Sequence, residues 1–201
     1  MIICVTNRIL CRDDFLVRLE EIAAARPWGI LLREKDLAAE EYATLAMTCS
    51  AICQRHQTRL LVHSHPALAE QLPSRWLHLP FPLFERNKRE GLHTSVSVHS
   101  AEEAVRAETV GAHCLVAGHI FSTACKPGLP PRGIGFLRAV CQSVSIPVFA
   151  IGGMSAERVS EVMGAGAAGI CVMSELMTCS DPGNRIREYK RRIGAVKEGY
   201  Q

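Results

Sequence analysis

Eight short apolar segments, separated by amphipathic stretches, constrain the fold of this chain more than any other feature of its sequence. The segments are apolar on both faces, as is typical of parallel strands covered by helices, and the stretches between them have helical periodicity. Eight such units close into a (β/α)8 barrel more naturally than into an open sheet. We therefore predict an α/β fold, a single compact TIM barrel. The predicted strands are Met1–Thr6, Trp28–Glu34, Arg59–Ser64, Trp76–Leu79, His93–His99, His113–Gly118, Pro147–Gly153 and Gly169–Ser174.

One barrel domain is expected to take up residues 1–201. A chain that is 48% hydrophobic can build one sizeable core, and no linker or low-complexity tract divides it. No G-x-G-x-x-G pattern follows the first strand, which counts against a dinucleotide-binding sheet. The segment PFPLFERNKREGL, after the fourth strand, contains prolines and has little periodicity. We expect a short, irregular or missing helix there.

The nine cysteines are scattered without a C-x-x-C pair, which is typical of a reduced protein that uses cysteine as a small apolar residue. No charged-then-apolar leader occurs, and no apolar run approaches the roughly 18 residues of a membrane span. We expect a cytoplasmic protein with no membrane partner.

The net charge is +3, and many basic residues fall in the C-terminal segment NRIREYKRRIGAVK. Ile186, Tyr189 and Ile193 mark an apolar stripe there, so we interpret the basic residues as the solvated face of a helix. No aromatic residues are interleaved for stacking on bases, and we expect no nucleic-acid partner. The expected partner is a small molecule, and the sequence leaves a homodimer open.

Active sites of such barrels lie at the carboxyl ends of the strands, where the polar residues of this chain concentrate. Gly152 and Gly153 follow the seventh predicted strand, and Ser174 ends the eighth. Barrels commonly bind phosphate at these two positions through backbone N–H groups. The alternative is a tight turn without a ligand. We predict a phosphate site at Gly152, Gly153 and Ser174.

Arg33 and Lys35 flank Glu34 at the end of the second predicted strand, so their side chains point to the same side. Two adjacent cations repel each other unless an anion lies near them. The alternative is a salt bridge to Glu34 or Asp36. The functional interpretation is a clamp on a phosphate or carboxylate.

His119 directly follows the sixth predicted strand and is the candidate acid or base, because an imidazole titrates near neutral pH. Thr123 and Lys126, in the loop that follows, could bind a substrate anion. A purely structural histidine is the alternative. Cys125 has no histidine close in sequence, and we interpret it as a bystander.

Four further histidines suggest a zinc hypothesis: His63, His65, His78 and His93. His63 and His65 are expected to share a strand face, which suits two ligands. No carboxylate accompanies them, and H-x-H is a pattern of low specificity. We therefore predict no metal and no cofactor.

The stretches LLREKD, SVHSAEEAVRAETVGAHCLVAGHIFSTACKPG and IPVFAIGGMSAERVSEVMGAGAAGICVMS resemble the thiamine-phosphate-synthase-like superfamily of barrels. This superfamily contains Mg²⁺-dependent synthases, which join a pyrimidine pyrophosphate to a thiazole phosphate. It also contains TenI-type thiazole tautomerases, which aromatise a thiazole carboxylate phosphate by moving a proton without a metal.

Two positions favour the tautomerase branch. Synthases carry acidic residues after strands three and four, whereas this chain has His63-Ser64 and HLPFPLF there, with no acid before Glu85. Synthases usually have Gly-Pro at the end of strand six, whereas this chain has Gly118-His119, which is similar to the tautomerases. The resemblance implies a metal-independent isomerase of thiamine biosynthesis that acts on a carboxythiazole ethyl phosphate, with His119 as acid/base.

The remaining substrate contacts are candidates only. They are Arg33, Lys35, His63, Ser97, Thr123 and Lys126. His63 or His65 could share the proton transfer. Two alternatives stay open: a thiamine-phosphate-synthase-type transferase, and a non-catalytic relative that binds a phosphate ligand and regulates.

Overall fold

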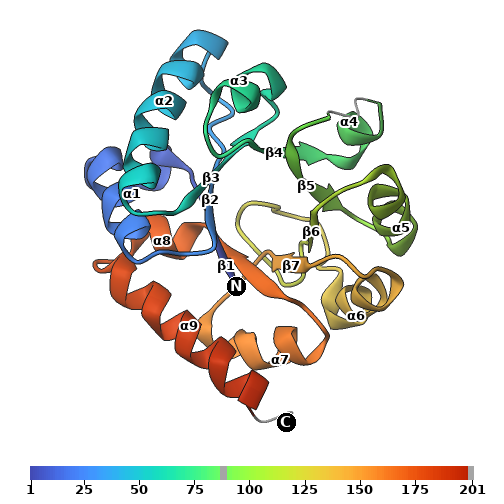
Figure 1. Cartoon of the computed structure of the whole chain (residues 1–201). Helices are drawn as coiled ribbons and strands as arrows, with labels where there is room; N and C mark the ends of the chain where they lie inside the picture. Colours follow the sequence, from blue (N-terminus) through green and yellow to red (C-terminus); the bar gives the residue numbers. More distant parts are fainter. Residues whose placement is uncertain (87–89, 199–201) are drawn as a thin grey trace.

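The chain folds into a closed barrel of eight parallel strands in sequential order, surrounded by helices (Figure 1). The computed structural model describes residues 1–86 and 90–198. Every predicted strand is present, and each boundary lies within two residues of its predicted position. The predicted TIM barrel is therefore confirmed. The strands are β1 (Ile2–Val5), β2 (Gly29–Leu32), β3 (Arg59–His63), β4 (Trp76–Pro80), β5 (His93–Val98), β6 (Cys114–Gly118), β7 (Val148–Ile151) and β8 (Gly169–Val172).

Helices cover the outer face of the barrel. They are α1 (Phe15–Ala24), α2 (Ala39–Arg55), α3 (Pro66–Gln71), α4 (Phe81–Arg86), α5 (Ala101–Val110), α6 (Gly133–Ser143), α7 (Val159–Gly164), α8 (Ser174–Thr178) and α9 (Pro182–Glu198), with 3-10 turns η1 (Arg8–Leu10) and η2 (Ala156–Arg158). None of the described helices is long and apolar enough to cross a membrane.

The helix after β4 is present and short, so of the outcomes expected for this segment the structure shows a short helix. Pro82 is the second residue of α4, where the missing backbone N–H removes no intrahelical bond. Phe81 and Phe84 are buried and attach the helix to the core. Residues 87–89 of the same predicted segment lie outside the described residues.

Two apolar layers form the core. The larger layer lies between the strands and the helices, and it includes Ile30, Val62 and Ile170. The smaller layer fills the barrel interior with Ile3, Val5, Leu31, Leu61, Cys114, Val116, Phe149 and Cys171. The interior is thus packed, and a ligand can only be held at an end of the barrel.

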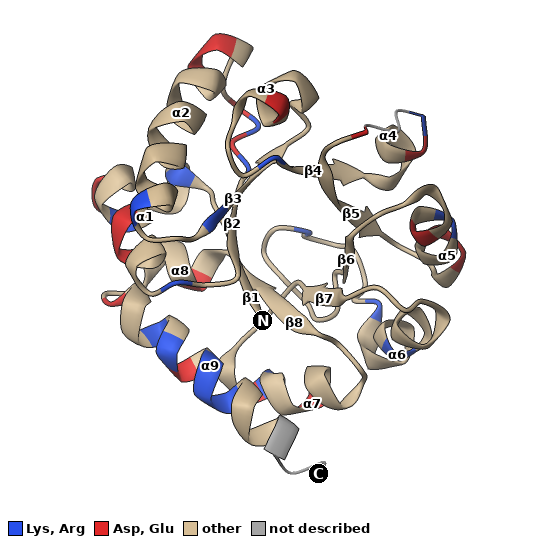
Figure 2. Ribbon diagram, viewed as in Figure 1, with Lys and Arg blue, Asp and Glu red and all other residues tan. Residues whose placement is uncertain are grey.

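Helix α9 places its basic residues as the sequence predicts. Ile186 and Tyr189 are fully buried and Ile193 nearly so, whereas Arg187, Lys190 and Arg191 are exposed. Figure 2 shows the basic positions along α9 in blue. Arg185 forms ion pairs with Glu175 and Glu188.

Candidate active site

A cavity of about 620 Å³ opens at the carboxyl ends of the strands. All ten residues singled out from the sequence line it: Arg33, Lys35, His63, Ser97, His119, Thr123, Lys126, Gly152, Gly153 and Ser174. They come from β3, from β5 and from the segments that follow β2, β6, β7 and β8. Their roles in binding and catalysis remain predictions.

Glu34 and Asp36 do not pair with the cations beside them. Glu34 is buried and accepts hydrogen bonds from the Thr6 hydroxyl at 2.5 Å and from the backbone N–H of Arg8 at 3.0 Å. Asp36 forms an ion pair with Arg8 at 2.6 Å. No ion pair of Arg33 or Lys35 occurs within the described part of the chain. The salt-bridge alternative is therefore wrong, and both cations remain available to an anion.

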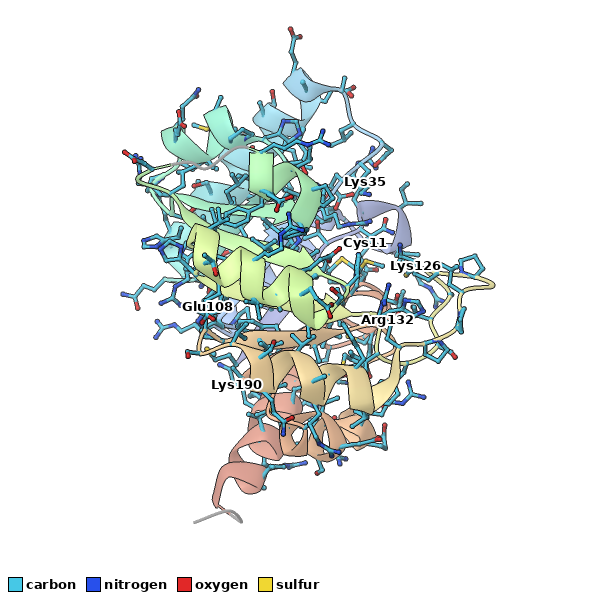
Figure 3. All side chains as sticks on the ribbon, turned by 90° about the vertical axis from the view of Figure 1, so that its right-hand side faces the viewer. Cys11, Lys35, Glu108, Lys126, Arg132 and Lys190 are labelled. Atoms are coloured by element: carbon cyan, nitrogen blue, oxygen red, sulfur yellow. The ribbon has the colours of Figure 1, made fainter. Side chains whose placement is uncertain are left out.

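Three cations approach one another at the cavity mouth. Repulsion from Arg33, then burial, then repulsion from Lys126 lower the pKa of Lys35. Figure 3 shows Lys35 and Lys126 on the same side of the molecule, although they belong to different loops. A site that assembles like charges from separate loops favours an anionic ligand, because the ligand relieves their mutual repulsion.

Two histidines on neighbouring strands form the polar wall of the cavity. The register of β3 and β4 pairs His63 with His78, and their rings stack with centroids 5.8 Å apart. Burial, followed by repulsion from Arg33 and Lys35, lowers the pKa of His63 to about 4. Burial lowers the pKa of His78 to about 3. Both rings are therefore neutral near pH 7.

His65 does not join this wall, so the expectation that His63 and His65 share a strand face is wrong. Strand β3 ends at His63, and Ser64 has a φ of 62°, which breaks the alternation of side chains. His65 instead stacks on Tyr42 with ring centroids 4.2 Å apart. The described residues contain no group of three His, Cys, Asp or Glu side chains placed to hold a metal.

His119 begins the loop between β6 and α6, which folds back across the cavity. Its Nε2 lies 3.4 Å from the carbonyl oxygen of Leu129, and its own carbonyl accepts a bond from the Arg132 N–H. Because a carbonyl only accepts, a neutral ring that makes this contact donates from Nε2, and Nδ1 is then the nitrogen that can accept a proton. The half-buried ring thus offers a basic nitrogen at the barrel mouth.

The two glycines after β7 have a packing reason beyond any ligand. Gly152 has a φ of 101°, and a Cβ there would lie 2.4 Å from the Cβ of His119. Gly153 has a φ of 63°, and a Cβ there would lie 2.5 Å from the Ser122 carbonyl oxygen and 2.9 Å from the Cβ of Phe121. The N–H groups of Gly153 and Met154 have no protein partner within the described residues. The turn therefore positions His119 and also leaves backbone donors beside the cavity.

Sequence reasoning left four polar lining residues outside the predicted site: His78, His99, Cys125 and Glu175. His78 and His99 lie near the ends of predicted strands, and this position was a signal that they belong to the site. Glu175 belongs to α8 and accepts hydrogen bonds from Tyr189 and Arg185. Cys125 lies 3.9 Å from the Ser174 hydroxyl across 49 residues of sequence, a contact that no local pattern reveals.

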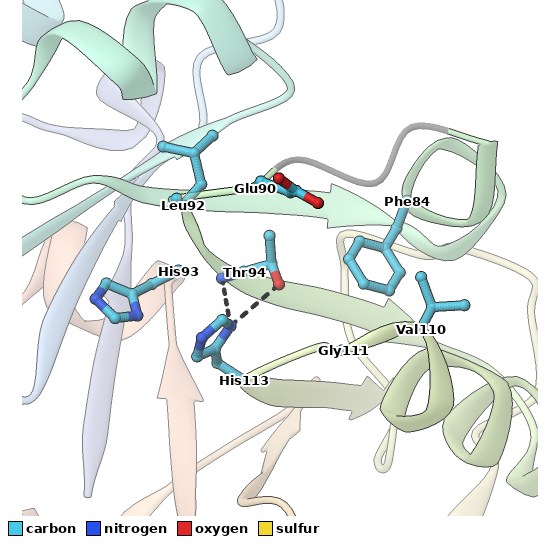
Figure 4. A pocket seen from close by; sticks show the side chains of 9 residues that line it. Phe84, Glu90, Leu92, His93, Thr94, Val110, Gly111 and His113 are labelled. Atoms are coloured by element: carbon cyan, nitrogen blue, oxygen red, sulfur yellow. Dashed lines mark hydrogen bonds between the residues drawn. The ribbon is translucent and has the colours of Figure 1, made fainter.

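A second cavity, of about 350 Å³, lies at the opposite end of the barrel (Figure 4). It is lined by His93 and His113 together with apolar residues of α4 and α5. The zinc hypothesis grouped His93 with His63, yet β5 begins at His93 and β3 ends at His63, so the barrel separates them. None of the ten predicted site residues lines this second cavity.

Comparison with known proteins places this geometry in a family. Residues 2–176 match the family model described as thiamine monophosphate synthase. The chain belongs to the thiamine monophosphate synthase family. "Thiamine-phosphate synthase 2" of Streptococcus pneumoniae serotype 4 is 30% identical, over 94% of this chain and 93% of the relative. "Putative thiamine-phosphate synthase 2" of Aquifex aeolicus is 31% identical, over 85% and 94%.

A solved structure has the same architecture. The thiamine phosphate pyrophosphorylase from Pyrococcus furiosus superposes with a TM-score of 0.84 at 26% identity, and the match covers 97% of this chain and 96% of that one. The names of these relatives correspond to the transferase alternative. Which reaction of the family this chain performs depends on the residues around its own cavity.

Proposed function

We propose that this protein is a thiazole tautomerase-like isomerase of thiamine biosynthesis, which aromatises a carboxythiazole ethyl phosphate with His119 as acid/base. The observation that carries the proposal is the set of groups around the cavity. Cations, neutral imidazoles and hydroxyls line it, and a single carboxylate, Glu175, does so among the described residues. These groups suit an anionic substrate and a proton transfer.

The transferase alternative requires Mg²⁺ in this family, and the cavity does not fit that ion. Mg²⁺ takes oxygen ligands and is usually held by one or two carboxylates. Glu175 already pairs with Tyr189 and Arg185, and the strands β3 and β4 end in His63 and Pro80 rather than in acidic residues. The names of the relatives favour the transferase, whereas the ligand chemistry of this cavity favours the isomerase.

The reaction needs one base and no redox partner. Nδ1 of His119 removes the proton from the ring carbon beside the carboxylate. The electron pair of that C–H bond enters the ring, and the exocyclic double bond becomes a ring double bond. The exocyclic carbon then takes the proton back from the imidazolium, so that atoms and charge balance. Aromaticity drives the shift, and a positioned acid/base group accelerates it by about 10² to 10⁴.

His119 carries both proton transfers in this proposal. His63 and His78, with pKa values of about 4 and about 3, stay neutral at pH 7 and are poor acceptors of a proton. His65 does not line the cavity. These observations support the proposal that His119, rather than His63 or His65, moves the proton.

The substrate carries two anionic groups, and the cavity offers two places for them. The backbone donors at Gly153 and the Ser174 hydroxyl would bind the phosphate. Arg33, Lys35 and Lys126 would bind the ring carboxylate. His63, Ser97 and Thr123 would complete the contacts to the ring and its substituents.

The test follows the absorbance change as the non-aromatic tautomer becomes aromatic. We expect the wild-type protein to accelerate the change and His119→Ala to lose about 10² to 10⁴ in rate. His93→Ala, at the opposite end of the barrel, is the matched control and keeps the wild-type rate.

Each negative outcome of this test identifies a different error. A wild-type rate equal to the uncatalysed rate, with thiamine phosphate formed from the pyrimidine pyrophosphate, the thiazole phosphate and Mg²⁺, would establish the transferase. Tight binding of the thiazole phosphate without turnover would establish the regulatory binder. Full activity of His119→Ala would leave the reaction in place and remove His119 as its base.

A further inference from the structure

A buried imidazole bridges two serines of the neighbouring strand. His78 of β4 lies beside β5, with its Nδ1 3.0 Å from the Ser95 hydroxyl and its Nε2 2.8 Å from the Ser97 hydroxyl. His78 is 4% exposed and Ser95 is fully buried, whereas Ser97 is half-buried and lines the cavity. The three groups form a hydrogen-bonded chain that leads from the barrel interior to the cavity.

A neutral imidazole cannot donate a hydrogen bond to both serines or accept one from both. One ring nitrogen carries a proton and donates, and the other is bare and accepts. If Nδ1 carries the proton, Ser97 must give its only hydrogen to Nε2 and has none left for a ligand. If Nε2 carries the proton, Ser97 receives a bond and keeps its own O–H for the cavity.

The charge around Ser97 decides between these two arrangements. Arg33 and Lys35 line the same cavity as Ser97, and a cavity with these cations suits an anionic ligand. An anion accepts hydrogen bonds and donates none, so Ser97 has to offer its own hydrogen to it. Ser97 can do so only if Nε2 of His78 carries the ring proton, and the hydroxyl of Ser95 then donates to the bare Nδ1.

We propose that His78 is a positioning residue that orients the hydroxyl of Ser97 as a hydrogen-bond donor to an anionic ligand in the cavity. Every bond of the chain from Ser95 through His78 to Ser97 then points toward the cavity. Arg33 and Lys35 attract the anion that receives the last bond. The identity of this anion rests on the proposed function, but the direction of the chain does not.

The tautomer of His78 tests the direction without any substrate. Two-bond proton–nitrogen NMR correlations of protein labelled with ¹⁵N-histidine distinguish a protonated ring nitrogen from a bare one. We expect a protonated Nε2 and a bare Nδ1. The signals of His78 are assigned as those that shift in Ser97→Ala, so the assignment does not depend on a His78 variant that folds. A protonated Nδ1 would overturn the proposal.

Binding of the aromatic carboxythiazole ethyl phosphate, measured by calorimetry, tests the consequence. We expect Ser97→Ala and His78→Asn each to weaken binding about tenfold, the loss of one hydrogen bond to a charged group. His78→Gln places an amide donor near the position of Nε2 and should retain most of the affinity. The double variant should bind no more weakly than Ser97→Ala, because His78 acts through Ser97.

Failure of this proposal can be distinguished from failure of the proposed function. A wild-type protein that does not bind the thiazole refutes the proposed function, and the NMR result still decides the direction of the chain. Tight wild-type binding with additive losses in the double variant refutes the role of His78 and leaves the proposed function intact.

Discussion

The two ends of the barrel both carry a pair of histidines, yet the pairs have different surroundings. His63 and His78 are largely shielded from water at the carboxyl ends of the strands, beside Arg33 and Lys35. His93 and His113 are exposed at the amino ends, where the ring of His93 stacks on Trp76 with centroids 5.0 Å apart. The residue type is the same in both pairs. Its position at the carboxyl or the amino end of a strand decides whether the histidine lines the polar cavity or packs against aromatic rings.

Aromatic side chains, among them Trp28 and Trp76, close the barrel interior at the amino ends of the strands. The ring centroids of Trp28 and Trp76 lie 5.0 Å apart in an edge-on arrangement, and those of Trp28 and Phe149 lie 5.1 Å apart. The guanidinium carbon of Arg59 lies 5.1 Å from the centroid of the Trp28 ring. Phe149 belongs to the apolar layer that fills the interior. The amino end is therefore built for stability, whereas the carboxyl end leaves charged and polar groups facing a cavity.

The largest expected effect is that a substitution at the carboxyl end lowers activity, whereas a substitution at the amino end lowers stability. His119→Ala should lose about 10² to 10⁴ in rate while its free energy of unfolding changes by less than about 0.5 kcal/mol. Trp76→Ala should do the reverse and lose about 3 kcal/mol of stability, with binding of the thiazole phosphate unchanged. Urea unfolding and calorimetry measure the two quantities. Weakened binding in Trp76→Ala would break the comparison.

The pH dependence of stability should be carried mainly by the carboxyl end. The pKa values of His63 and His78 are lowered in the folded protein, so the unfolded chain binds more protons below pH 6.5. Stability from the neutral rings is complete above pH 6.5. It falls as the pH drops toward 4 and then 3, by up to about 1.4 kcal/mol per pH unit for each ring.

This pH prediction is tested by the slope of the free energy of unfolding against pH, because a substitution can change the stability itself for other reasons. Urea unfolding between pH 6.5 and 4 should show a shallower slope for His63→Gln than for the wild type, because one titrating ring is gone. His113, whose pKa burial and His93 also lower, adds a contribution of the same sign at the other end. An unchanged slope in His63→Gln would contradict the assignment of the effect to the cavity wall.

The smallest expected effect concerns charge alone. Lys35→Met should weaken binding of the carboxythiazole ethyl phosphate about tenfold, since a charge-assisted hydrogen bond to the ring carboxylate is lost. Arg59→Met removes the same charge at the amino end, where Arg59 lies over Trp28, and should leave this binding unchanged. Equal losses in the two variants, measured by titration calorimetry, would mean that net charge rather than the cavity attracts the ligand.

Local patterns were sufficient for the strands and for the position of His119. Apolar runs on both faces predict buried parallel strands, and the closing of eight units predicts which strand ends share a rim. The same reasoning failed at His65, because the left-handed backbone of Ser64 ends the strand one residue early. It also left out Cys125, whose neighbour Ser174 comes from another loop.

The sequence by itself determined the barrel and the rim on which its polar residues gather, because periodicity and apolar runs are properties of neighbouring residues. Only the tertiary structure decided how each polar group is used. Glu34 accepts hydrogen bonds from Thr6 and Arg8 rather than pairing with Arg33, and His78 hydrogen-bonds to Ser95 and Ser97 of the neighbouring strand. Hydrogen bonds and pKa shifts depend on what lies within a few ångströms, and in a closed barrel those neighbours come from other strands.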